Sequence, residues 1–138
     1  MRRQVAGVAL AFAIGALAGG CGSPSGDLFE VVRSGADRNA NVRLLVSDGG
    51  SVRCNRRAAV PLDADRLLTA RQLARDLQGQ AALGLELARG RGSILSYRAR
   101  LEAGTIAFSD RSRGIPPSFN RLAAFTADVA ERVCKLER

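Results

Sequence analysis

Alternation of apolar and polar residues is the first pattern along the chain, and it is typical of half-buried strands. Five stretches show this alternation or are apolar and β-branched enough to form a strand: residues 28–33, 42–47, 51–55, 94–101 and 105–109. Asp48-Gly49-Gly50 separates the second stretch from the third and is a strong hairpin signal. Glu102-Ala103-Gly104 is expected to turn the fourth stretch back onto the fifth. Strands joined by such short turns predict an antiparallel sheet.

Two other stretches repeat apolar residues at helical spacing. Asp63 is the expected N-cap of the first helix, which should end between Gln78 and Gly84. The second helix is expected to cover 118–136, after a pair of prolines. The apolar stripes are Leu67, Ala70, Ala74, Leu77 and Ala81 in the first helix, and Leu122, Phe125, Val129, Val133 and Leu136 in the second.

The predicted order of elements is β-β-β-α-β-β-α. An antiparallel sheet of about five strands with two helices on one face is an α+β two-layer sandwich. Residues 27–138 are expected to form this single domain, and 55–59 is expected to be a polar loop. Tyr97 lies mid-strand among apolar neighbours and is predicted to be core, and Cys134 is predicted to lie beside the stripe of the last helix.

The beginning of the chain has the features of a secretory signal. Two arginines precede an apolar run from Val5 to Ala18, which is shorter than the about 20 residues that span a bilayer. Small residues and Cys21 follow, in the manner of the lipobox of bacterial lipoproteins. We therefore predict a signal peptide at 1–20, lipidation of Cys21 and a short tether over 21–26. Ordinary cleavage after Ala18, and a retained membrane anchor, are the alternatives.

The number of cysteines favours lipidation. The chain has 3 cysteines, Cys21, Cys54 and Cys134, and an odd number in an exported protein leaves one thiol unexplained. If Cys21 carries lipid, the other two can form a disulfide, which export permits. A redox role would favour C-x-x-C spacing, which the pair lacks. We predict a structural disulfide that joins a strand to the last helix.

Composition and charge narrow the classes of binding partner to be expected. Hydrophobic residues make up 46% and charged residues 25% of the chain, as in a globular protein. The net charge is +8, and loss of the two arginines of the signal leaves +6. Arginine supplies nearly all of the positive charge, a bias typical of a GC-rich genome. Nucleic acid is not expected as a partner, because the protein is exported and only 4% of its residues are aromatic.

The chain lacks the residues that most kinds of catalytic site require. The chain has no histidine, which excludes Ser-His-Asp and Cys-His nucleophiles, histidine metal sites and histidine acid–base catalysis. Asp63 and Asp65 are close in sequence, but acidic residues are favoured at a helix start for capping. We therefore expect no enzyme activity, no cofactor and no metal.

Arginines in and beside the predicted loops are the candidate binding residues. Arg53, Arg56, Arg57, Arg111 and Arg113 are candidates for an anionic partner, either anionic lipid or an envelope protein. The loop Ala88–Ser93, with Arg89 and Arg91, is the candidate reactive loop of a serine peptidase inhibitor. The preferred prediction is a non-catalytic lipoprotein, exported and anchored to the outer face of the cell membrane, that binds an envelope component or protein partner. Peptidase inhibition is the alternative.

The sequence resembles a group of small actinobacterial lipoproteins of uncharacterised function over most of the mature chain. The segments that carry the resemblance are 27–29, 42–44, 48–55, 96–98, 108–110 and Val133-Cys134. These motifs are structural, so the resemblance implies no catalytic residue. A fainter similarity is to the subtilisin-inhibitor-like secreted proteins, which are also single α+β domains. Their reactive loop is braced by a disulfide, and Ala88–Ser93 contains no cysteine.

Overall fold

The computed structural model describes residues 26–36 and 38–136. The strands are β1 (Asp27–Gly35), β2 (Val42–Ser47), β3 (Ser51–Cys54), β4 (Ala59–Pro61), β5 (Leu95–Leu101) and β6 (Gly104–Ser109). The helices are α1 (Ala64–Ala82), α2 (Pro117–Asp128), a 3-10 turn (Arg38–Ala40) and a π-helical turn, η2 (Val129–Val133). The predicted signal, Cys21 and most of the tether lie outside the described residues. No helix in the described part of the chain is long and apolar enough to cross a membrane.

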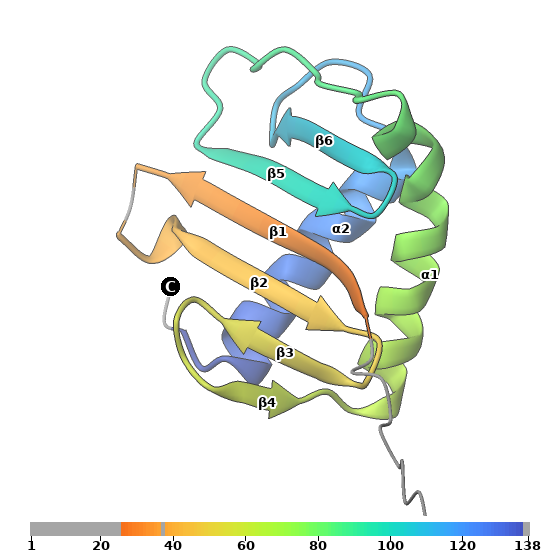
Figure 1. The fold of residues 1–138 in the computed structure, drawn as a ribbon. Helices are drawn as coiled ribbons and strands as arrows, with labels where there is room; N and C mark the ends of the chain where they lie inside the picture. The colour runs from red at the N-terminus through yellow and green to blue at the C-terminus, as the bar shows by residue number, and fades with distance from the viewer. Residues whose placement is uncertain (1–25, 37, 137–138) are drawn as a thin grey trace, which may run out of the picture.

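The six strands form one antiparallel sheet in the order β4-β3-β2-β1-β5-β6. Helices α1 and α2 both lie against the same face of this sheet, and its other face carries no helix (Figure 1). The predicted α+β class and two-layer arrangement are therefore confirmed. Strand β1, the first in the chain, lies in the middle of the sheet between β2 and β5.

The hydrophobic core fills the space between the sheet and the two helices. Alternate residues of the strands point into it, and the buried residues of α1 are Ala70, Leu73, Ala74, Leu77 and Ala81. Phe108 contacts both Tyr97 and Phe119, with ring centroids 4.9 Å apart in each pair, so Tyr97 is a core residue as predicted. In the part of the chain that the structure describes, the buried core residues run from Phe29 to Cys134.

The start of the first helix follows its sequence signal. The side chain of Asp63 accepts a hydrogen bond from the backbone N–H of Arg66, and the helix ends at Ala82, inside the predicted interval. The polar loop expected before it is present over residues 55–58, but the structure adds a strand after it. Residues Ala59–Pro61 form a sixth strand, which pairs Val60 with Val52 at the edge of the sheet. Proline is tolerated there because an edge strand leaves one side unpaired.

The last helix does not continue as an α-helix to its end. After Asp128 the chain makes one π-helical turn, in which the N–H of Cys134 donates to the carbonyl of Val129, five residues earlier. Each π-turn inserts one residue relative to the α-helical repeat. Cys134 therefore takes the buried position that helical spacing assigned to Val133, which is only partly buried. The prediction that Cys134 lies beside the stripe is corrected to a place in the core.

The disulfide predicted between Cys54 and Cys134 is present. It joins the end of β3 to the residue that follows η2, and the two Cα atoms are 5.9 Å apart. The bond links residues 80 positions apart and fixes the end of the second helix onto the sheet.

Candidate functional site

The helix-free face of the sheet is rich in arginine. Residues that alternate with the core positions of β2, β3 and β5 point to this face, which we call the open face. Its arginines on strands are Arg43, Arg53, Arg98 and Arg100. Strand pairing aligns two of them across β1, because Val32 is opposite both Arg43 and Arg98. These arginines come from three strands and lie on one surface.

Two glutamates lie among these arginines. Glu30 on β1 accepts from Arg43 at 2.6 Å through Oε1 and from Arg100 at 2.9 Å through Oε2. Glu86 pairs in register beside Ala107 of β6 and accepts from Arg98 at 2.9 Å. The arginine side chains are 59–70% exposed in these pairs, so the pairs contribute little to stability. They do hold the guanidinium groups in defined positions over the sheet.

A fifth arginine joins the open face from the loop before β5. Arg89 donates to the hydroxyl of Ser96 and to the carbonyl of Ser93, both at 2.6 Å. The loop is held in turn by Ser109, whose hydroxyl accepts from the N–H of Gly90 and lies 2.7 Å from the hydroxyl of Ser93. Because both acceptors of Arg89 are neutral, its side chain is positioned while its charge stays uncompensated by them.

The charges of the two layers differ. The five arginines and two glutamates described above carry together an excess of three positive charges. The helical layer, counted as Asp63, α1, α2 and η2, carries five acidic residues and five arginines and is neutral. Of these two sets of residues, only the set on the open face has an excess of positive charge.

A hollow of about 520 Å³ lies on the open face among three of its five arginines. Arg43, Arg89 and Arg98 line it, together with the hydroxyl residues Ser34 and Ser96. Glu86 is the acidic residue among its lining residues. Three guanidinium groups and two hydroxyl groups around one shallow hollow are hydrogen-bond donors suited to an anion.

The predicted loop arginines lie at one end of the sheet. The loop with Arg56 and Arg57 follows β3, and the loop with Arg111 and Arg113 follows β6. Strand pairing places both loops at the Gly35 end of β1, but at opposite edges of the sheet. The two clusters therefore share an end of the molecule without meeting on one patch.

Only one of the predicted anion-binding arginines lies on the open face. Arg53 points there from β3, opposite Leu45. Arg57 instead donates to the carbonyl of Cys134, on the helical side, at 3.3 Å. Arg111 packs by its backbone against Gly90, where an added Cβ would lie 1.6 Å from the Arg111 carbonyl oxygen.

The candidate inhibitor loop is folded back onto the domain. A turn closed by Ser93 N–H to the Gly90 carbonyl, at 3.2 Å, shapes it, and Arg89 is held on the sheet as described above. Arg91 is exposed and is the arginine that this loop presents outward. Inhibition through Ala88–Ser93 stays a prediction, with Arg91 as its contact residue.

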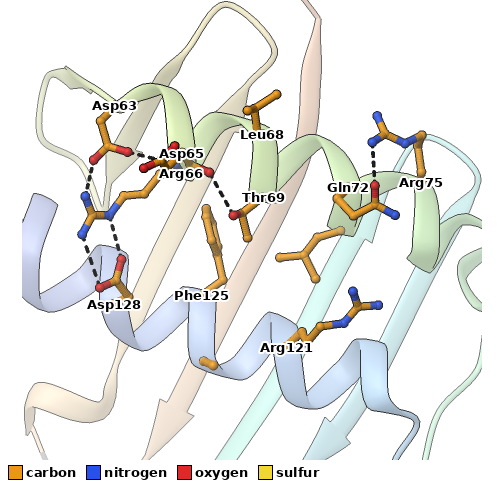
Figure 2. Close-up of a pocket in the computed structure, with 12 residues that line it drawn as sticks. Asp63, Asp65, Arg66, Leu68, Thr69, Gln72, Arg75, Arg121, Phe125 and Asp128 are labelled. Carbon is orange, nitrogen blue, oxygen red and sulfur yellow. Dashed lines mark hydrogen bonds and ion pairs between the residues drawn. The ribbon is translucent and has the colours of Figure 1, made fainter.

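The helical side has a groove of about 920 Å³ between α1 and α2, lined by apolar and charged residues. Figure 2 shows Arg66 at one end, reaching from α1 to both Asp63 and Asp128. The exposed Leu68 lies beside the groove, and Phe125 forms part of its floor. Three aspartates and three arginines line it, so its lining has no net charge and is less suited to an ionic ligand than the open face.

The ion pairs of Arg66 have a defined electrostatic effect. The backbone N–H of Arg66, and then its guanidinium, donate to Asp63 and hold the pKa of that carboxyl below its ordinary value of 3.8. The hydrogen bonds that the Arg66 guanidinium donates to Asp128 and then to Asp63 raise the pKa of Arg66 above its ordinary value. Nε of Arg66 donates to Oδ2 of Asp128 at 2.7 Å. Through these two ion pairs, which we call the Arg66 clamp, Arg66 links the start of α1 to the end of α2.

Arg43, Arg98 and Arg100 were not among the predicted site residues. Their alternation with core residues along the strands was visible in the sequence and placed them on the solvent side. These arginines lie close together because β1 lies between β2 and β5. The alternation of apolar and polar residues does not predict this order of strands.

The comparisons with known proteins give no match: no family model, curated protein or solved structure is similar to this chain. Among residues 26–36 and 38–136, no cluster of three or more His, Cys, Asp or Glu side chains could hold a metal ion.

Proposed function

We propose that the protein is a non-catalytic lipoprotein, anchored through Cys21 to the outer face of the cell membrane, whose open face binds the anionic lipid surface. The observation that carries the binding is the difference between the layers: three excess positive charges on the open face and none on the helical layer. Anionic membranes attract such residues by about 1 kcal/mol per arginine near the surface.

The point at which the tether joins the domain favours an orientation in which the sheet lies flat on the membrane surface. Gly26 precedes β1, whereas the loop arginines lie at the other end of the nine-residue strand, about 30 Å away. A tether of six residues reaches about 20 Å. An upright domain would hold those loops away from the membrane, but a flat one brings the whole open face into contact. The diacylglyceryl group implied by the lipobox resemblance would supply the two acyl chains that stable anchoring needs.

Vesicle binding tests the surface part of the proposal. A chain beginning at Gly22 keeps all the core residues of the described part and lacks Cys21, so its binding to vesicles measures the contribution of the domain without the lipid. Removing Arg53 and Arg100 together by alanine substitution should cost about 2 kcal/mol, or about thirtyfold in partition to phosphatidylglycerol vesicles. Phosphatidylcholine vesicles should bind neither form, and binding should fall as salt rises.

The matched control removes the same charge from the helical layer. Arg75 and Arg132 are exposed there, and their double alanine variant has the same net charge as the open-face variant. We expect it to bind phosphatidylglycerol vesicles nearly as well as the unchanged chain. Equal losses in the two variants would mean that net charge alone governs binding, and the proposed face would be wrong.

The anchor is tested separately on the full chain in a bacterial host that processes lipoproteins. The mature protein should be found in the membrane fraction, with a mass that corresponds to a lipid-modified chain beginning at Cys21. Cys21→Ser should prevent the modification and abolish membrane attachment through lipid. An unmodified mature chain that begins at Gly19 would instead establish cleavage after Ala18 and overturn the anchor.

A further inference from the structure

We infer that the hollow on the open face is a binding site for a phosphate group, of the kind carried by a lipid headgroup or by free phosphate. The inference rests on the proposed function, because it names the chemical group that the open face recognises. It concerns Arg43, Arg89 and Arg98 with Ser34 and Ser96, which all line the same hollow.

The backbone sets the spacing of the three guanidinium groups. Arg43 and Arg98 are both opposite Val32, on the strands to either side of it, so their Cα atoms are about 10 Å apart. Arg89 is fixed to Ser96, which is two residues from Arg98 on the same strand and about 7 Å from it. Arginine side chains are long enough to reach a common group from these three positions.

Each arginine retains unused donors. A guanidinium has five N–H groups in a rigid fork. One hydrogen bond to Glu30 engages Arg43, one to Glu86 engages Arg98, and two to neutral oxygens engage Arg89. These bonds orient the three guanidinium groups. Among the described residues, they use only a minority of the five N–H groups of each guanidinium. A ligand would therefore meet donors that are already oriented, which lowers the entropic cost of binding.

Phosphate fits this arrangement better than carboxylate. A carboxylate has two oxygens in a plane, which one arginine fork can satisfy. A phosphate group is tetrahedral and offers several acceptor oxygens in different directions, so it can accept from three guanidinium groups at once. The hydroxyls of Ser34 and Ser96, which also line the hollow, add further donors. A surface built only for charge would need no such convergence.

The test compares phosphate with carboxylate at equal surface charge. Vesicles containing phosphatidic acid and vesicles containing oleate are adjusted to the same zeta potential and mixed with the chain beginning at Gly22. We expect binding at least about tenfold tighter to the phosphatidic acid vesicles. Arg89→Lys keeps the charge but loses the fork, and should remove about tenfold of this affinity while leaving oleate binding unchanged.

Two further variants control the geometry. Arg53→Lys makes the same chemical change on the open face outside the hollow and should leave the preference for phosphate intact. Ser96→Ala removes an acceptor that orients Arg89 and should reduce the preference without changing charge. Equal binding to both vesicle types, or equal effects of the Arg89 and Arg53 variants, would overturn the phosphate site while leaving the charged face established. Absence of binding to either anionic vesicle would instead refute the proposed function.

The source of the phosphate is decided by titration with inorganic phosphate. Chemical-shift changes at Arg89, Ser96 and Arg98 that saturate at millimolar phosphate, and are weakened by Arg89→Lys, would support a site for free phosphate. No response to inorganic phosphate, together with a retained preference for phosphatidic acid vesicles, would support a headgroup held in a lipid surface.

Discussion

Cys54 and Cys134 form a disulfide because a single π-helical turn brings the second cysteine round to the core. The N–H of Cys134 bonds to the carbonyl of Val129, and the cysteine side chain is buried against the end of β3. In an uninterrupted α-helix, Val133 would occupy this place. The irregular turn is therefore part of the covalent structure of the fold.

Loss of the disulfide should destabilise the domain substantially. A bond that closes a loop of 80 residues constrains the unfolded chain by about 4–5 kcal/mol in the chain-entropy model, and measured values are typically about 2–4 kcal/mol. Replacing both Cys54 and Cys134 by serine should lower the free energy of unfolding in urea by this order. A change below about 1 kcal/mol would show that the helix end is held by packing alone.

The sequence pattern predicted the fold class and most elements because these depend on local periodicity and turn chemistry. Strand β4 escaped prediction because three residues are too few to show a periodicity, and its pairing with β3 depends on tertiary contact. The π-turn escaped for a similar reason, since helical spacing assumes a constant repeat. Both depend on tertiary packing around Val52 and Cys54.

Acid should weaken the Arg66 clamp at the start of α1. The pKa of Asp63 in the folded protein lies below its ordinary value of 3.8, so the carboxylate stabilises the fold above about pH 4. That contribution is lost as the pH falls from about 4 through the lowered pKa. Asp63→Asn keeps a good N-cap but has no charge to lose. Its free energy of unfolding should depend less on pH between about 4 and 2, and parallel pH profiles would contradict the assignment.

Substitution at Gly90 should change the shape of the hollow without changing its charge, and so test whether binding depends on the shape. An added Cβ would lie 1.6 Å from the carbonyl oxygen of Arg111, so Gly90→Ala must displace the loop that positions Arg89. We expect weaker phosphatidic acid binding and a loss of stability, since overpacking costs about 1–3 kcal/mol. Calorimetric unfolding and vesicle sedimentation on the same samples measure both.

Gly79 provides the matched control for this change. It lies within α1, is exposed and has nothing within 4 Å of an added Cβ. Gly79→Ala should stabilise the domain by about 0.5–1 kcal/mol and leave vesicle binding unchanged. If both glycine variants bound vesicles as the unchanged chain does, the loop would have no part in the site.

The candidate site was less predictable than the fold. The sequence prediction selected arginines that are close together in the chain, most of them in predicted loops. Arg53 and Arg89 were among these residues. Arg43 and Arg100 converge on Glu30 only because β1 is central, and the pair formed by Arg100 and Glu30 spans 70 residues. Pairing between strands so distant in sequence has no local signal, so the open face is evident only in three dimensions.

The inhibitor alternative makes a prediction of its own. Arg89 and Arg91 are both exposed in Ala88–Ser93, but the guanidinium of Arg89 is hydrogen-bonded to Ser96. Since the loop is turned back and packed on the domain, we expect trypsin and subtilisin to be left fully active by equimolar protein. Stoichiometric inhibition of trypsin that Arg91→Ala abolishes and Arg113→Ala preserves would establish the alternative.

Neutralising Glu30 should strengthen the attachment to anionic membranes. Its side chain is 14% exposed and offsets both Arg43 and Arg100, so Glu30→Gln raises the excess charge of the open face from three to four. At about 1 kcal/mol for each charge near the surface, partition to phosphatidylglycerol vesicles should rise about fivefold. Asp76→Asn makes the same charge change beside Arg121 on the helical layer and should have little effect. Equal gains from the two variants would point to net charge, and a loss with Glu30→Gln would mean that Glu30 is needed to orient the arginines rather than to balance them.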